Sequence, residues 1–333
     1  MFFLESVARN KMYDARRLFQ SFQVAGPVSL GLGISLILFK MFGAVCLRKG
    51  YNKLVGKVVV ITGASSGLGE ALAHEFYKHG CLVVLCARRR QELERVREDL
   101  LHTHSNMTTY PPVIMPLDLG DIRELPRHVE KILAITGKID ILVNNGGCSS
   151  RGSVLDTSIE VDEKIMLVNY FGTVAMTKAV LKDMVARREG HIVFVSSVQG
   201  LIAIPERSSY SASKHAMQAF SDSLRAEVAA HDLSVTTVSP GYVRTKLSEN
   251  ALAGNGSAYG RTDEATASGY SPEYVAARIV RAVVRNEKEA VICPLLPRIV
   301  IFARKLLPFL YFYVMQRRAR ASSLKALAGN TSQ

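Results

Sequence analysis

From residue 57 onwards, short runs rich in β-branched residues alternate with amphipathic stretches of helical length. The runs predict strands at residues 57–62, 82–86, 113–117, 139–144, 191–195 and 235–239. The stretches between them predict helices at residues 67–79, 90–101, 122–135, 161–185, 210–229 and 272–285. Nearly continuous apolar strands that alternate with helices form a parallel sheet covered on both faces. The sequence therefore predicts one doubly wound α/β domain.

A glycine-rich turn, TGASSGLG at residues 62–69, joins the first predicted strand to the first predicted helix. Gly63 would permit a tight turn, Gly67 the approach of a pyrophosphate, and Gly69 close packing of the helix. No lysine follows the last glycine, which excludes the phosphate-binding loop of nucleoside triphosphatases. The turn thus predicts a dinucleotide site.

The second predicted strand is followed by Arg88, Arg89 and Arg90, where a site for NAD(H) would carry an acid for the ribose 2′-hydroxyl. Arginines at this point favour a 2′-phosphate, so NADP(H) is expected in preference to NAD(H). The alternative for Arg89 or Arg90 is a solvated residue at the start of a helix, and we expect at least one of the three to bind phosphate.

Tyr210 and Lys214 lie four residues apart, which places them on one face of a predicted helix. A neighbouring ammonium favours the phenolate, so Lys214 would make Tyr210 a better proton relay to a carbonyl group. This spacing often occurs by chance on a solvated helix face, so by itself it is weak evidence for a catalytic pair. The other motifs described below make it specific.

Further polar residues stand where strand ends of a parallel sheet face the ligand crevice. Ser197 follows the strand at 191–195, residues 144–147 read NNGG, and residues 240–245 read PGYVRT after the last strand. Asn169 is a polar amide inside a helical pattern, and an amide at such a position needs a reason.

In order and spacing these motifs resemble the short-chain dehydrogenase/reductase (SDR) family over residues 57–293, with most similarity to its membrane-anchored member 7B branch. The resemblance implies a Rossmann fold in which Tyr210, Lys214, Ser197 and Asn169 form the catalytic tetrad. Tyr210 would be the acid/base, and Ser197 and Tyr210 would hold the substrate oxygen. The chain departs from the family at Gly147, where alanine then glycine is usual, and Cys148 follows.

The turn and the resemblance together give the expected cofactor contacts: Gly63, Ser65, Ser66, Gly67, Leu68, Gly69, Arg88, Arg89, Asp118, Asn145, Gly146, Tyr210, Lys214, Pro240, Gly241, Val243 and Thr245. Five cysteines without metal-type spacing indicate neither a zinc site nor a disulfide framework, so no metal is expected.

The basic charge lies at the two ends of the chain. Residues 1–57 hold nine basic and two acidic side chains, residues 291–333 hold seven basic and none acidic, and the segment between them is nearly neutral. A nucleic-acid enzyme carries its basic charge on the folded domain, so nucleic acid is not an expected partner. Arg151, Arg207 and Lys246 are expected mainly as solvated surface charges, with binding of a lipid phosphate as the alternative.

Residues 24–47 contain Lys40 as their only charge and would be about 36 Å long as a helix, which is enough to cross a bilayer. We interpret this segment as a membrane anchor. A cleaved signal peptide is disfavoured because no clear cleavage site follows, and a buried core helix because the segment contains glycines and a proline. Basic residues flank both ends, so the orientation stays open. The expected location is the endoplasmic reticulum membrane, with the peroxisomal membrane as the alternative.

At the other end, residues 294–315 mix large apolar residues with arginine and lysine, and Pro297 and Pro308 argue against one straight spanning helix. Such a segment is typical of a helix lying in the headgroup plane of an acidic leaflet. Packing over the rim of the active site is the alternative, and both could hold. The expected organisation is a basic segment (1–23), the anchor (24–47), the Rossmann catalytic domain (54–293) and this C-terminal segment (294–333).

The sequence therefore predicts a membrane-anchored NADP(H)-dependent oxidoreductase acting on a lipid-soluble carbonyl or secondary alcohol, such as a steroid, retinoid or keto-lipid. The alternative is a catalytically idle NADP(H)-binding protein that serves as a membrane-associated binding or regulatory partner. A serine hydrolase is discounted because His191 and His215 are explained as a strand-start residue and a helix-surface residue. The sequence leaves the oligomeric state open, and the resemblance implies a homodimer through the helices at 161–185 and 210–229.

Overall fold

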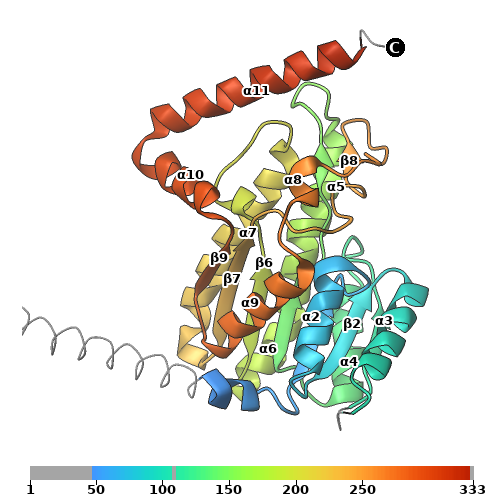
Figure 1. Ribbon diagram of the computed structural model, residues 1–333. Coiled ribbons are helices and arrows are strands. Elements are labelled where there is room, and N and C mark those ends of the chain that lie inside the picture. The colour runs from blue at the N-terminus through green and yellow to red at the C-terminus, as the bar shows by residue number, and fades with distance from the viewer. Residues whose placement is uncertain (1–46, 107–109, 331–333) are drawn as a thin grey trace, which may run out of the picture. The chain divides into compact units, whose positions relative to one another are not determined.

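The computed structural model describes residues 47–106 and 110–330, with side chains described as far as residue 321. Seven strands form one parallel sheet in the order β3-β2-β1-β4-β6-β7-β9 (Figure 1). They are β1 (Val58–Thr62), β2 (Leu82–Ala87), β3 (Val113–Pro116), β4 (Ile141–Asn144), β6 (His191–Val195), β7 (Ser234–Pro240) and β9 (Glu289–Ile292). The strand order reverses between β1 and β4, and ligands of such sheets bind at the carboxyl ends of the strands on either side of that point. The predicted doubly wound Rossmann fold is confirmed.

Helices cover both faces of the sheet. On one face α2 (Gly67–Tyr77) packs against α9 (Pro272–Val284), beside α3 (Arg90–Thr103) (Figure 1). On the other face lie α4 (Leu125–Thr136), α6 (Gly172–Arg187) and α7 (Ser208–Glu227). Their buried residues recur at helical spacing, as in the row of Met176, Val180 and Met184 on α6, and pack against apolar strand residues such as Phe194. Burial of these rows on the sheet fixes where α6 and α7 stand at the site.

The helix predicted at residues 161–185 is divided into three parts. It consists of α5 (Ile159–Met166), a π-helical turn at Leu167–Phe171, and α6. A π turn inserts an extra residue into a helix, and such turns occur frequently at functional sites. This one contains Asn169, whose side chain has no exposed surface.

Three short strands and one short helix were not predicted. The edge strand β9 holds only a few apolar residues after Glu289, so it lacked a strand-like run. The strands β5 (Ser150–Arg151) and β8 (Leu252–Ala253) pair in parallel as a second sheet, and α8 (Glu264–Ala267) follows in the same loop. The β5–β8 pairing fixes the segment after β7 to the segment that follows β4. We call the segment after β7 (residues 242–270) the substrate loop, because mobile loops at this place in such folds close over ligands.

The C-terminal segment forms two helices, α10 (Leu295–Leu306) and α11 (Pro308–Asn330) (Figure 1). They divide at Leu307, which is non-helical at φ −133° and ψ 61° because a proline follows it. Pro297 lies in the first turn of α10, where its missing N–H breaks no helical bond. No helix among the described residues is both long and apolar enough to span a bilayer. The predicted anchor at residues 24–47 lies, apart from Leu47, outside the described residues.

Candidate active site

Two hydroxyl groups meet at the carboxyl end of β6. Ser197 follows this strand with an extended backbone, and its Oγ accepts a hydrogen bond of 3.1 Å from the Gln199 N–H, which caps a short 3₁₀ turn. Tyr210 is the third residue of α7, and its hydroxyl lies close enough to Ser197 for the Ser197 hydroxyl to act to lower its pKa. Both side chains are buried. The strand end and the helix start therefore bring the two hydroxyl groups together at the carboxyl edge of the sheet.

Lys214 lies one helical turn after Tyr210, as its spacing predicts. Its Nζ donates a hydrogen bond of 2.9 Å to the Val195 carbonyl and lies 5.8 Å from the centre of the Tyr210 ring. Burial lowers the pKa of Lys214 to about 8, because desolvation disfavours the ammonium. The ammonium is thus held by β6 beside the phenol ring.

The acidity of Tyr210 differs from the sequence-based expectation that Lys214 would lower its pKa. Burial raises the pKa of Tyr210 above its ordinary value, and the hydrogen bond with Ser197 and the charges of Arg151 and Arg207 only partly oppose this rise. Desolvation exceeds these opposing effects because the phenol is shielded from water. Tyr210 is therefore a protonated donor near neutral pH.

The Asn169 side chain connects the loop after β4 to α7. Its Oδ1 accepts from the Cys148 N–H at 2.8 Å, and its Nδ2 donates to the Cys148 carbonyl at 2.9 Å and to Ser213 Oγ at 3.0 Å. A Cβ added to Gly147 would lie 2.9 Å from Asn169 Oδ1, so the glycine leaves room for the amide. These contacts give the buried amide of the π turn a structural reason and bring Asn169 to the same site.

The glycine-rich turn has the shape of a dinucleotide cradle. Gly67 has φ +57°, and a Cβ added there would lie 3.0 Å from Thr245 Cγ2, so the loop after β7 meets the turn. A Cβ added to Gly69 would lie 2.1 Å from the Gly63 carbonyl oxygen. Helix α2 begins at Gly67, and the first N–H groups of a helix have no partner within it. Backbone at these positions can therefore approach a pyrophosphate closely, and the residues present fit a dinucleotide.

The end of β4 is tied to the end of β1 through Thr62. Its Oγ1 accepts from the N–H groups of Asn145 and Gly146 at 3.0 and 2.9 Å, and Asn145 Nδ2 donates to the Thr62 carbonyl at 2.9 Å. These bonds hold the two strand ends together where the strand order reverses. Ser66 and Leu68 lie at the start of α2 within the same turn, next to Ser65.

The three arginines after β2 have different surroundings. Arg89 Nη2 lies 3.4 Å from Ser65 Oγ of the glycine-rich turn, whereas Arg90 Nε forms an ion pair with Glu94 at 2.9 Å on its own helix. Arg88 and Arg89 are exposed at the carboxyl end of β2. Arg89 thus faces the glycine-rich turn, whereas Arg90 is paired on its own helix.

The remaining expected cofactor contacts lie at other strand ends on the same edge. Asp118 is exposed shortly after β3, and its Oδ1 accepts from the Gly120 N–H at 2.9 Å. Pro240 ends β7, and the Gly241 N–H donates to the Ile292 carbonyl of β9 at 2.9 Å. Val243 forms an isolated bridge with Tyr270. The loop that carries Val243 and Thr245 thus starts beside the glycine-rich turn and is fixed at both of its ends.

Sequence reasoning missed a buried charge cluster in the substrate loop. Asp263 Oδ2 accepts from Arg151 Nη2 at 2.7 Å, from Arg207 Nη2 at 3.0 Å and from Ser248 Oγ at 2.6 Å. Arg151 and Arg207 are both buried, so their interpretation as solvated surface charges is wrong, whereas Lys246 is exposed. Arg207 precedes the first residue of α7, so the cluster fixes the substrate loop to the helix that carries Tyr210.

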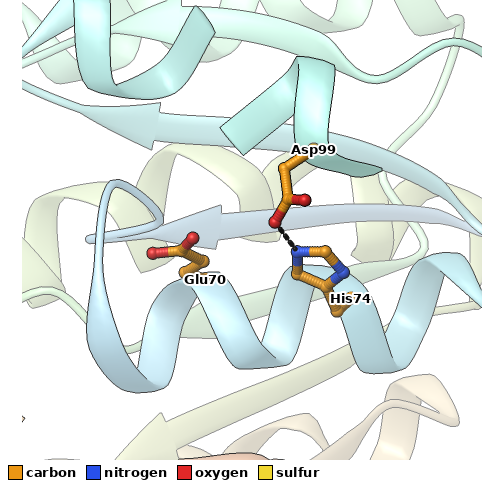
Figure 2. Close-up of side chains that lie close together, drawn as sticks. All are labelled: Glu70, His74 and Asp99. Atoms are coloured by element: carbon orange, nitrogen blue, oxygen red, sulfur yellow. Dashed lines mark ion pairs between the residues drawn. The ribbon is translucent and has the colours of Figure 1, made fainter. Parts of the chain in front are cut away.

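A second cluster of charged side chains lies outside this site, on the outer surface of α2 and α3. Glu70, His74 and Asp99 come together there, and His74 Nε2 forms an ion pair with Asp99 at 3.2 Å (Figure 2). Arg95 of α3 binds both oxygens of Glu70, at 2.8 and 3.0 Å. Arginine and histidine thus account for the carboxylates as ion pairs between two helices.

Comparisons with known proteins agree with this geometry. The family model of the short chain dehydrogenases matches residues 57–256. A "Dehydrogenase/reductase SDR family protein 7-like" of Anopheles gambiae is 56% identical over 290 residues, covering 87% of this chain and 92% of the relative. "Dehydrogenase/reductase SDR family member 7B" of Xenopus laevis is 47% identical over 275 residues, covering 82% and 85%.

Solved structures share the fold. A short-chain dehydrogenase/reductase from Burkholderia phymatum in complex with NAD superposes with a TM-score of 0.67 at 22% identity, covering 76% of this chain and 95% of that chain. An alcohol dehydrogenase from Thermococcus sibiricus complexed with 5-hydroxy-NADP gives a TM-score of 0.60 at 26% identity, covering 71% and 95%. The family uses a nicotinamide cofactor and a small-molecule substrate. The chain therefore belongs to the short-chain dehydrogenase/reductase family of oxidoreductases, and it is similar to that family's member 7B branch.

Proposed function

We propose that this protein is a membrane-anchored, NADP(H)-dependent oxidoreductase that interconverts a lipid-soluble carbonyl compound and its secondary alcohol. The observation that carries the proposal is that the hydroxyl groups of Ser197 and Tyr210 lie together, with Lys214 one turn away, at the sheet edge that holds the glycine-rich turn. A proton donor beside a dinucleotide cradle is the arrangement that carbonyl reduction needs.

In the direction of reduction, Tyr210 donates its hydroxyl proton to the substrate oxygen. Its raised pKa keeps the proton on the phenol near neutral pH, because burial disfavours the phenolate. Ser197 holds the same oxygen through its hydroxyl group and so directs it toward Tyr210. A bound nicotinamide cofactor supplies the hydride in this direction and accepts it in the other.

Lys214 and Asn169 hold Ser197 and Tyr210 in position. One N–H of the Lys214 ammonium binds the Val195 carbonyl. Its remaining N–H groups can donate to a ribose hydroxyl of the cofactor and return a proton to Tyr210 after each transfer. Asn169 holds the loop at Cys148 and, through Ser213, the turn of α7 between Tyr210 and Lys214. In this proposal Tyr210, Ser197 and Lys214 are catalytic residues, and Asn169 positions them.

The preference for NADP(H) rests on the charge at the end of β2. Arg88 and Arg89 are exposed there, and Arg89 reaches Ser65 of the glycine-rich turn. An arginine at this point pairs with a 2′-phosphate, whereas an acid would bind the 2′-hydroxyl of NAD(H). Arg88 and Arg89 are therefore the proposed 2′-phosphate ligands.

The lipid solubility of the substrate rests on the apolar segment at residues 24–47, which we propose as the anchor in the endoplasmic reticulum membrane. Oxidation of NADPH by the detergent-solubilised full chain against a panel of lipid ketones and aldehydes tests the function, with Tyr210→Phe as the blank. Tyr210-dependent NADPH consumption is the expected result. Binding of NADPH with no oxidation by any compound of the panel would favour the idle binding protein instead.

A further inference from the structure

The helix α10 has an apolar face that nothing in the described part of the chain covers. None of its residues is buried. Its exposed large apolar residues recur at helical spacing and form one stripe, which consists of Leu295, Leu296, Ile299, Phe302 and Leu306. Leu295 is 72% exposed and Leu306 73%, at the two ends of the helix. Soluble surfaces rarely leave a continuous apolar stripe of this kind in water.

The stripe continues into the first turns of α11, where Phe309 is 72% exposed and Phe312 and Tyr313 are also exposed. One residue of this helix is buried instead. The Tyr311 hydroxyl donates a hydrogen bond to the Ala203 carbonyl of the folded body, and Arg304 lies 5.4 Å from the Tyr311 ring centre and 5.0 Å from that of Phe312. These contacts hold α10 and α11 together, so the stripe belongs to a fixed structure.

The positive charge of the C-terminal segment favours an anionic partner. Residues 291–333 carry seven lysines and arginines and no acidic residue. Within α10 the basic residues are Arg298, Arg304 and Lys305, and in α11 they include Arg317, Arg318 and Arg320. A second copy of the chain docked on this face would bring like charges together. Anionic lipid headgroups supply the opposite charge, and an acyl-chain boundary accepts large apolar side chains.

We propose that α10 and the first turns of α11 form a docking surface for the anionic face of a lipid bilayer, in addition to the proposed anchor at residues 24–47. The stripe enters the boundary between headgroups and acyl chains, and the arginines and lysine meet lipid phosphates. In this proposal both helices lie at the membrane surface, since neither is both long and apolar enough to cross the bilayer.

The position of this surface has a consequence for the active site. Ala203, which Tyr311 contacts, lies in the segment that leads from Ser197 to Tyr210. A docked α10–α11 pair therefore holds that segment near the lipid surface. If the proposed function holds, a lipid-soluble substrate passes between the bilayer and the crevice over this short path, but the docking itself does not depend on the reaction.

The test uses the full chain in lipid vesicles. The chain has no tryptophan, so Phe302→Trp places a single tryptophan in the stripe, which is excited selectively at a wavelength that tyrosine does not absorb. The vesicles contain phosphatidylcholine brominated in its acyl chains, with or without a minor fraction of phosphatidylserine. Bromine quenches only a tryptophan that touches the lipid. Binding through the anchor alone therefore gives no signal, and the readout is independent of enzymatic activity.

Docking predicts loss of emission from Phe302→Trp in vesicles that contain phosphatidylserine, and a smaller loss without it. The matched control is Tyr110→Trp, which is exposed before β3 and should stay unquenched. Adding Lys305→Glu and Arg318→Glu to Phe302→Trp should remove the effect of phosphatidylserine, whereas Lys131→Glu on α4 should not.

Two results would overturn the proposal. One is a Phe302→Trp chain that floats with the vesicles and keeps its full emission. The other is a tryptophan emission that shifts to the blue as protein concentration rises in the absence of lipid, and that brominated lipid does not quench. That result would identify a second copy of the chain as the occupant of the stripe.

Discussion

The buried ammonium of Lys214 donates a 2.9 Å hydrogen bond to the backbone carbonyl of Val195. This bond joins the second turn of α7 to the carboxyl end of β6. Because Tyr210 lies one turn earlier on α7 and Ser197 lies two residues beyond Val195, the bond sets the relative position of the two hydroxyl groups. Burial lowers the pKa of Lys214 to about 8, so its charge depends on pH within a range open to measurement.

This pKa predicts a pH-dependent stability. The folded-state pKa of Lys214, about 8, lies below the ordinary value of 10.5, so between these two pH values the unfolded chain binds the additional proton. The free energy of unfolding of the wild-type chain, relative to Lys214→Met, should therefore increase as pH rises from about 8 and level off near 10.5. The full change would be about 3 kcal/mol. Urea unfolding at several pH values measures it, and a constant difference would contradict the lowered pKa.

Asn169→Ala should lower both stability and turnover. The substitution leaves the Cys148 N–H, the Cys148 carbonyl and the Ser213 hydroxyl without the amide, at about 1–3 kcal/mol for a buried group that loses its partner. Thermal unfolding and kcat provide the two readouts. Asn250→Ala on the exposed surface of the substrate loop is the matched control and should leave both unchanged. Equal behaviour of the two variants would refute the positioning role of Asn169.

The choice of cofactor should depend on Arg88 and Arg89. Replacing Arg89 by aspartate removes the cation beside the turn and adds a ligand for a ribose 2′-hydroxyl, so preference for NADPH over NADH should fall roughly tenfold or more. Arg88→Asp should act in the same direction. The comparison is Arg90→Asp, because Arg90 pairs with Glu94 on α3 and should not influence the ratio. The measurement is the ratio of kcat/KM with NADPH to kcat/KM with NADH. If this ratio is unchanged in both Arg88→Asp and Arg89→Asp, the NADP(H) assignment is overturned.

Removal of the charge on Asp263 should release the substrate loop. Asp263→Asn leaves Arg151 and Arg207 buried without their shared carboxylate, which should destabilise the fold by about 3 kcal/mol. The variant should also be cut faster by trypsin after Arg261, which is exposed in the same loop. Asp232→Asn removes the carboxylate of an exposed pair with Arg188 and should change little. Unaltered proteolysis of Asp263→Asn would show that the loop is held by other contacts.

The sheet was predictable because its strands carry their own signal. The runs at 191–195 and 58–62 are apolar on both faces, and only a sheet covered by helices buries such strands. Ser197 could be assigned to that edge from topology, since every parallel strand ends there, whereas Tyr210 was assigned to the site through the resemblance to the family. The helix break before Pro308 also followed from sequence, because the residue before a proline avoids the helical conformation.

The charge cluster and the π turn could not be predicted. Asp263 is 112 residues from Arg151 and 56 from Arg207 in the chain, so nothing local marks these arginines as buried partners of a carboxylate. Residues 161–185 have a helical pattern throughout, and the turn at Asn169 depends on its bonds to Cys148 and Ser213, which only the folded chain brings together. The raised pKa of Tyr210 is likewise a result of burial, which the spacing to Lys214 does not indicate.

The most direct test of the central claim compares Tyr210→Phe with the wild-type chain in two measurements on the same detergent-solubilised samples: NADPH binding by titration, and NADPH oxidation with a lipid ketone that the wild type reduces. The phenol oxygen is the proposed proton donor, and phenylalanine keeps the ring that fills the space beside Lys214. We predict that binding is retained while oxidation is lost. Oxidation at the wild-type rate by Tyr210→Phe would contradict the role of Tyr210 as the catalytic acid.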